Sequence, residues 1–273
     1  MLNSRLFYQA IAAAVQRNGQ RGCCSEFYIS HDNAGNGTGP FGRYSGGRHA
    51  CAALGLRRRG KWGDLSAEFK ECKLGKEQSP IDISTKTAEK AKLPAIGFNY
   101  KAAASEVVNN GHTIQVNLTD AGSAKLAGGD YQLLQFHFHT PGEEKVDGRN
   151  FAMVAHLVHK SAAGGLGVVG VMFREGKENA ALKAVFEAMP AKEGGKSALK
   201  ASLNAADFLP ADKGYFAFKG SLTTPPCSEG VAWQVLKQPV ELSKAQIDAF
   251  RKLYKMNARP VQPLNGRKVQ ESS

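Results

Sequence analysis

Two strand-like segments that carry histidines, 131–139 and 151–159, place the strongest constraint on how this chain can fold. In QFHFH at 135–139, the polar side chains occupy every second position and phenylalanines stand between them. An extended strand points successive side chains to opposite faces, so the histidines share one face and the phenylalanines the other. We therefore expect a sheet that carries a polar cluster on one face and packs a core against the other.

Similar strand-like runs recur from Trp62 onward and are separated by Gly, Asn, Asp and Pro residues. Helical periodicity is confined to two short segments, 178–188 and 243–255. We predict a predominantly β (α+β) fold, a single domain around a large central, mostly antiparallel, twisted β-sheet with short peripheral helices. The other expected strands are 96–100, 105–108, 112–118, 166–174, 215–218 and 231–236.

The first 60 residues differ from the rest of the chain in composition. They include the cluster GNGTGPFGRYSGGRH, and no helical or strand period continues beyond about Val15. We predict that 1–60 is an atypical, poorly ordered N-terminal extension, either a targeting segment or a misassigned start. The folded domain is predicted to span 61–273.

The net charge of +12 raises the question of a nucleic-acid partner. The first 61 residues hold nine Lys or Arg against two acidic residues, which accounts for seven of the surplus charges. The remaining five are scattered without a basic stripe, so we expect no nucleic-acid partner. No apolar run is long enough for a membrane span, and none is expected.

The cysteines contain no CxxC pair, which argues against a thiolate zinc site of the finger type. Cys72 and Cys227 stand alone in the predicted domain, far apart in the sequence. Composition allows either two buried thiols or one disulfide that closes a long loop.

A third histidine extends the polar cluster. If 131–139 and 151–159 are neighbouring antiparallel strands, His156 can face the same side as His137 and His139. Three neutral imidazoles that leave one position open are typical of catalytic zinc. A rival interpretation is the cupin metal motif, which His137, His139 and Glu143 also match, but Tyr131 stands where cupins have a glycine.

Seven segments, in order, then identify a family: the chain resembles the α-class carbonic anhydrases, nearest to the bacterial, extracytoplasmic type. These segments are WGDLS at 62–66, CKLGKEQSPIDI at 72–83, NNGH at 109–112, QFHFH at 135–139, AHLVH at 155–159, GSLTTPPC at 220–227 and ARPVQPLNGR at 258–267.

The resemblance implies a Zn2+ enzyme for the reversible hydration of CO2 to bicarbonate and a proton. The zinc ligands would be His137, His139 and His156, and zinc-bound hydroxide would attack CO2. Thr223 would accept a hydrogen bond from that hydroxide and donate its own proton to Glu143. His112 would be the proton shuttle, because an imidazole can accept and release a proton near neutral pH.

The resemblance also implies supporting residues. Asn110 and Gln115 would line the polar side of the site, and Gln135 would orient His137. A backbone carbonyl near Asn257 would orient His139. The substrate pocket would consist of Val158, Val168, Leu222, Thr224, Val231 and Trp233.

The chain departs from the family pattern at two positions near the third ligand. Val154 stands where the family normally has the glutamate that accepts the second ring N–H of His156, and Glu144 replaces a histidine that commonly follows Glu143. Valine accepts no hydrogen bond, so we predict that His156 lacks its usual partner and that zinc retention is weakened. Upstream of Trp62, only Tyr44 could be a displaced remnant of the family's active-site tyrosine.

By the same resemblance, Cys72 and Cys227 form a disulfide, which implies an oxidising compartment and a periplasmic or secreted protein. An organellar transit peptide is the alternative. Sulfonamide inhibitors are expected to bind, and the chain to be a monomer or homodimer. The alternative function is a carbonic-anhydrase-related binding protein with little or no activity, to which Val154 lends weight.

Overall fold

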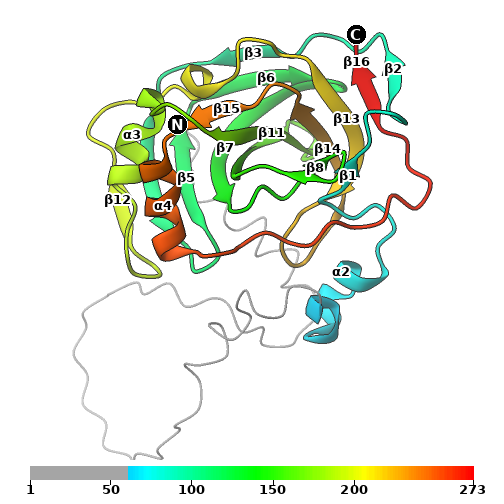
Figure 1. The fold of residues 1–273 in the computed structure, drawn as a ribbon, viewed down its shortest axis with the longest axis horizontal. Coiled ribbons are helices and arrows are strands. Elements are labelled where there is room, and N and C mark those ends of the chain that lie inside the picture. Colours follow the sequence, from blue (N-terminus) through cyan, green and yellow to red (C-terminus); the bar gives the residue numbers. More distant parts are fainter. Residues whose placement is uncertain (1–60) are drawn as a thin grey trace, which may run out of the picture. The chain divides into compact units, whose positions relative to one another are not determined.

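The computed structural model describes residues 61–273, which fold around a 13-stranded mixed sheet (Figure 1). The predicted extension 1–60, including Tyr44, lies outside the described residues. The main sheet contains β2 (Glu89–Ala91), β3 (Gly97–Tyr100), β4 (Ala104–Asn109), β5 (Ile114–Thr119), β6 (Gly122–Leu126), β7 (Gly129–His139), β10 (Met153–Ser161), β11 (Leu166–Glu175), β12 (Lys196–Ala198), β13 (Tyr215–Ser221), β14 (Glu229–Leu236), β15 (Val240–Leu242) and β16 (Gln270–Ser272).

The strand order is β12-β4-β5-β7-β10-β11-β14-β13-β16-β2, with β3, β6 and β15 paired off this path. Most neighbours are antiparallel, as predicted, but β11 pairs in parallel with both β14 and β15, and β16 pairs in parallel with β2. A separate small sheet is formed by β1 (Asp82–Ile83), β8 (Lys145–Val146) and β9 (Arg149–Asn150). The helical elements are η3 (Ala67–Phe69), α2 (Glu71–Leu74), α3 (Ala180–Glu187), η4 (Ala205–Phe208) and α4 (Lys244–Leu253).

The two predicted helices correspond to α3 and α4, which lie next to each other (Figure 1). Each begins at a side-chain cap: Asn179 accepts from the Leu182 N–H, and Ser243 forms a capping box with Gln246. Within residues 61–273, no helix has the length and apolarity that a bilayer crossing requires.

The main sheet separates two hydrophobic clusters. One cluster contains Phe136 and Phe138 of β7, together with the buried faces of α3 and α4. The other lies on the opposite side and includes Val154 of β10, Val168 of β11 and Trp233 of β14. The alternation of β7 therefore places its phenylalanines in the first cluster and turns its histidines toward the second.

Candidate metal centre

The register of β7 and β10 brings the three predicted histidines together. His156 lies opposite His137 in the antiparallel pair, and Val154 lies opposite His139. One candidate ligand atom from each of the three imidazoles lies within 4.8 Å of the other two. His139 and His156 are buried, and His137 is partly exposed. The arrangement follows from the two-residue period of each strand and from the pairing of these strands.

The β7 histidines each use Nδ1 for an orienting contact. Nδ1 of His137 lies 2.9 Å from Oε1 of Gln135, two residues earlier on the same face. Nδ1 of His139 lies 3.2 Å from the backbone oxygen of Asn257. Both contacts agree with the expectation from the family resemblance. They place the ring proton on Nδ1 and make Nε2 the metal-ligating atom of both rings.

The third histidine is oriented by a residue that was not predicted from the sequence. Nε2 of His156 lies 3.1 Å from Oε1 and 3.2 Å from Oε2 of Glu144, which is 1% exposed. The prediction that Val154 leaves His156 without a side-chain partner is therefore wrong. The acceptor comes from the turn after β7 instead of from β10. Nδ1 becomes the metal-ligating atom of His156.

Val154 itself belongs to the apolar side of the site. Its side chain is fully buried and packs in the cluster that contains Ile81, Ile83 and Met172. A valine is suited to that environment, whereas a carboxylate there would need a partner to offset its desolvation. The predicted loss of zinc retention assumed a missing acceptor, and that acceptor is present as Glu144.

The electrostatics of the three rings fit a cation. Burial and repulsion from His156 lower the pKa of His137 to about 3, which keeps this imidazole neutral. Burial also lowers the pKa of His156, but the carboxylates of Glu144 and Glu143 more than offset it, so that its pKa is raised. Three imidazoles backed by two buried carboxylates form a donor set suited to Zn2+.

Glu143 connects the histidines to the predicted threonine. Its Oε1 accepts the backbone N–H of Arg259 at 2.6 Å and lies 3.3 Å from Nδ1 of His139. The Thr223 side chain lies close enough to this carboxylate to lower its pKa, against the effect of burial. Burial raises the pKa of Glu143 to about 7, and the opposing attraction of His156 is smaller. Thr223 is 6% exposed and so is buried beside Glu143.

Arg259 is a supporting residue that was not predicted from the sequence. Its guanidinium donates to Oε1 of Gln78 at 2.9 Å, to the Ser79 backbone oxygen at 2.7 Å and to the Cys72 backbone oxygen at 3.0 Å. It also lies 5.7 Å from the centre of the Trp62 ring. Arg259 thus ties the start of the domain to the segment that holds Glu143. Arg259 belongs to the segment 258–267 that matches the family, and this match could have indicated its importance.

The predicted disulfide between Cys72 and Cys227 is confirmed. It joins α2 to the segment that carries Thr223, four residues before Cys227. Gln78 adds a second connection, because its Nε2 donates to the Cys227 backbone oxygen at 3.0 Å. The threonine segment is therefore fixed from two sides.

The residues predicted to form an apolar pocket converge beside His156. Val168, Val231 and Trp233 are each 2% exposed, and the partly buried Val158 and Leu222 pack against the same cluster. The Trp233 ring meets the His156 ring edge to face, with the ring centres 4.8 Å apart. Thr224, by contrast, is exposed.

His112 lies in an exposed turn before β5, whereas it was predicted to begin that strand. Oδ1 of Asn110 accepts the backbone N–H groups of His112 at 3.0 Å and Thr113 at 2.9 Å, so Asn110 shapes this turn. Gln115 accepts a weak contact from Asn110 at 3.4 Å and lies opposite His137 in the pairing of β5 with β7. Gln115 thus links the turn to β7, the ligand strand, which carries His137 and His139.

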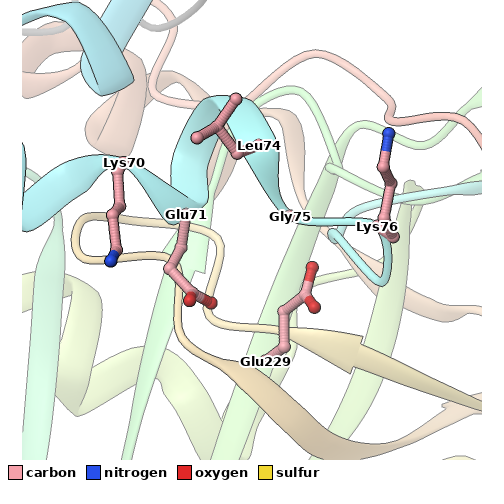
Figure 2. Close-up of a pocket in the computed structure, with 6 residues that line it drawn as sticks. All are labelled: Lys70, Glu71, Leu74, Gly75, Lys76 and Glu229. Carbon is pink, nitrogen blue, oxygen red and sulfur yellow. The ribbon is translucent and has the colours of Figure 1, made fainter.

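A separate surface hollow of about 290 Å³ lies beside α2 (Figure 2). Its most prominent acidic residue, Glu229, uses Oε1 to accept the Glu77 backbone N–H at 2.7 Å and the Gln78 side chain at 2.9 Å. Glu229 thus connects the start of β14 to the segment that follows α2. The residues that line the hollow are Lys70, Glu71, Leu74, Gly75, Lys76 and Glu229.

Comparison with known proteins agrees with the geometry. The family model described as eukaryotic-type carbonic anhydrase matches residues 57–273. A carbonic anhydrase of Neisseria gonorrhoeae is 46% identical over 212 residues, covering 77% of this chain and 83% of that protein. One from a Nostoc species is 41% identical over 215 residues, covering 77% and 81%.

Several solved structures are similar to this chain in both sequence and fold. The α-carbonic anhydrase of Thermovibrio ammonificans, in complex with sulfanilamide, is 47% identical with a TM-score of 0.76 and covers 78% of this chain and 94% of its own. A structure of dioscorin complexed with ascorbate is 29% identical with a TM-score of 0.74 and covers 78% and 92%.

Proposed function

The chain belongs to the α-carbonic anhydrase family, and we propose that it catalyses the reversible hydration of CO2 at a zinc site. The observation that carries the proposal is the cluster of three imidazoles whose candidate ligand atoms lie within 4.8 Å of one another. Each ring has its other nitrogen in contact with an orienting oxygen. Such contacts are typical of histidines that bind a metal.

Zinc would be held by Nε2 of His137, Nε2 of His139 and Nδ1 of His156. When bound, it supplies the Lewis acidity that makes a nucleophile of water at neutral pH, as is known for carbonic anhydrases. The cupin interpretation, with Glu143 as a ligand, is not favoured, because within residues 61–273 the metal-ligand group contains only the three histidines and Oε1 of Glu143 accepts the Arg259 backbone N–H.

Thr223 and Glu143 would select and orient the nucleophile. We expect the Thr223 hydroxyl to donate to the nearby Glu143 carboxylate, which leaves only its lone pairs for another partner. Thr223 therefore accepts a hydrogen bond from the attacking group and directs that group's remaining lone pair at CO2. The apolar side chains of Val168, Val231 and Trp233 would hold CO2 close to it, since CO2 needs no charged partner.

His112 would carry the released proton to solvent. Its turn is exposed, and Asn110 and Gln115 provide polar groups between it and the ligand strand. An imidazole exchanges protons with buffer at neutral pH, which suits this role.

The Cys72–Cys227 disulfide supports a periplasmic or secreted location. We propose that the catalytic domain corresponds to 61–273, that sulfonamides inhibit it, as the sulfanilamide complex of the Thermovibrio ammonificans relative suggests, and that it is a monomer or homodimer.

The decisive experiment measures bound zinc and acetazolamide-sensitive CO2 hydration in the same purified protein. One zinc per chain together with inhibitable hydration is expected. Zinc without hydration would instead favour the alternative, a carbonic-anhydrase-related binding protein, and absence of both would contradict the proposal.

A variant pair tests the orienting role of Thr223. Thr223→Val removes the hydroxyl but keeps the shape, and we expect kcat/KM to fall about 100-fold because the nucleophile loses its orientation. Thr223→Ser keeps the hydroxyl and is expected to retain most of the activity. Equal activity in the valine and serine variants would contradict this role.

A further inference from the structure

Glu144 and Val154 occupy exchanged roles around the third histidine. The family resemblance implied a carboxylate at position 154 and commonly an imidazole at position 144. This chain has an apolar residue at 154 and a carboxylate at 144. In the structure both side chains are buried, Val154 within the apolar cluster and Glu144 against His156. The two departures are thus spatially related, although ten residues separate them.

We propose that Glu144 is the positioning residue of the third zinc ligand and replaces the carboxylate that the family places on the strand of that ligand. The inference rests on the proposed zinc site and deepens it. Glu144 faces Nε2 of His156 with both oxygens, at 3.1 and 3.2 Å, and this contact directs Nδ1 toward the other two ligands.

The burial of Glu144 supports a dedicated role. Its side chain is fully buried, and a carboxylate in that position needs a strong hydrogen-bond donor. Glu143 cannot take over, because its Oε2 lies 3.9 Å from Nδ1 of His156, on the metal-ligating side of the ring, and its Oε1 accepts from Arg259. Glu144 is therefore the carboxylate that fixes the tautomer and direction of the His156 ring.

The same geometry predicts that a glutamate at position 154 would not improve zinc binding. A glutamate in place of Val154 would enter a cluster of Ile81, Ile83 and Met172 near a ring nitrogen that Glu144 already occupies. Val154→Glu is then expected to leave zinc affinity unimproved and to lower the thermal stability. If missing support at 154 limited zinc retention, the same substitution would tighten zinc binding.

The experiment measures zinc dissociation constants by chelator competition in the full chain. Glu144→Met is expected to weaken zinc binding about 10–100-fold, a range for which carbonic anhydrases are themselves a measured example. Glu144→Gln keeps an accepting oxygen without the charge and should show a smaller loss. Met172→Ala, which disturbs the neighbouring apolar cluster, is the matched control and should alter stability without altering zinc affinity.

The double variant Glu144→His/Val154→Glu tests the exchange directly. It rebuilds the family arrangement and should recover most of the affinity lost in Glu144→His alone. A proton NMR signal of the His156 Nε2–H provides a readout independent of activity: it should be present in wild type and absent in Glu144→Met, even in metal-free protein.

The zinc measurements distinguish a failure of the proposed function from a failure of the inference about Glu144. Wild-type protein that binds no zinc would overturn the proposed function. Wild-type protein that binds zinc with the same dissociation constant as a folded Glu144→Met variant would overturn this inference alone, as would tighter zinc binding by Val154→Glu.

Discussion

Two histidines of β10 are equally buried but have different hydrogen-bond partners. His156 is 1% exposed and His159 is 0% exposed, yet they lie on opposite faces of the strand. His156 contacts the Glu144 carboxylate, whereas His159 lies between the Tyr100 hydroxyl, 2.6 Å from its Nε2, and the Gly167 backbone oxygen, 3.3 Å from its Nδ1. Burial alone does not decide what a histidine does, and its partners do.

The partners also set the charge of each ring. Burial lowers the pKa of His159 to about 4, and its two contacts suit a neutral ring that accepts from Tyr100 and donates to Gly167. Burial raises the pKa of Tyr100, so its hydroxyl stays a donor. The carboxylates around His156 oppose the effect of burial and raise its pKa. We expect three experiments to separate the two histidines.

The largest expected difference is in metal binding. His156→Gln removes a ligand itself and should weaken zinc binding by more than about 100-fold, the upper range for loss of an orienting partner. His159→Gln should leave the zinc dissociation constant unchanged, because its ring faces the opposite side of the sheet. Chelator competition on both variants provides the measurement. Equal losses would contradict the separation of roles.

The next difference is in acid stability. The ordinary pKa of a histidine is 6.5 and that of folded His159 is about 4, so between these values the unfolded chain takes up a proton that the folded one excludes. This contribution to stability is present above pH 6.5 and is lost as the pH falls toward 4.

Between pH 7 and pH 5, His159 alone should therefore remove about 2 kcal/mol from the free energy of unfolding. Urea unfolding of wild type and His159→Gln at both pH values measures this quantity as a difference, in which other titrating groups cancel. A pH dependence that is identical in the two proteins would show that His159 does not titrate in this way.

The smallest expected effect concerns the partner of His159. Tyr100→Phe retains the ring that stacks on His159 but removes one hydrogen bond, and we expect a loss of about 1 kcal/mol in unfolding free energy at pH 7. The neutral imidazole also loses its donor, so its pKa should rise and the acid-induced loss should shrink. Zinc affinity should not change, and a clear change would link the two faces of the sheet.

Much of the fold and of the ligand set could be predicted from local patterns. The alternation in β7 fixed which side chains share a face, and the same alternation in β10 placed His156 beside them. Gln135 could be predicted as a partner because it lies two residues from His137 on the same face. Short strands at the edges of the sheet, such as β12 and β2, contain too few residues to show a periodic pattern and were not predicted.

The sequence by itself thus determined the sheet-forming segments, the three-histidine pattern and, through the family pattern, the disulfide. Only the tertiary structure decided which carboxylate supports His156, how Arg259 braces Glu143 and why His159 stays neutral. The physical reason is the range of the interactions. Strand periodicity acts between residues one or two positions apart, whereas these contacts join segments whose approach depends on the turns and packing of the whole domain.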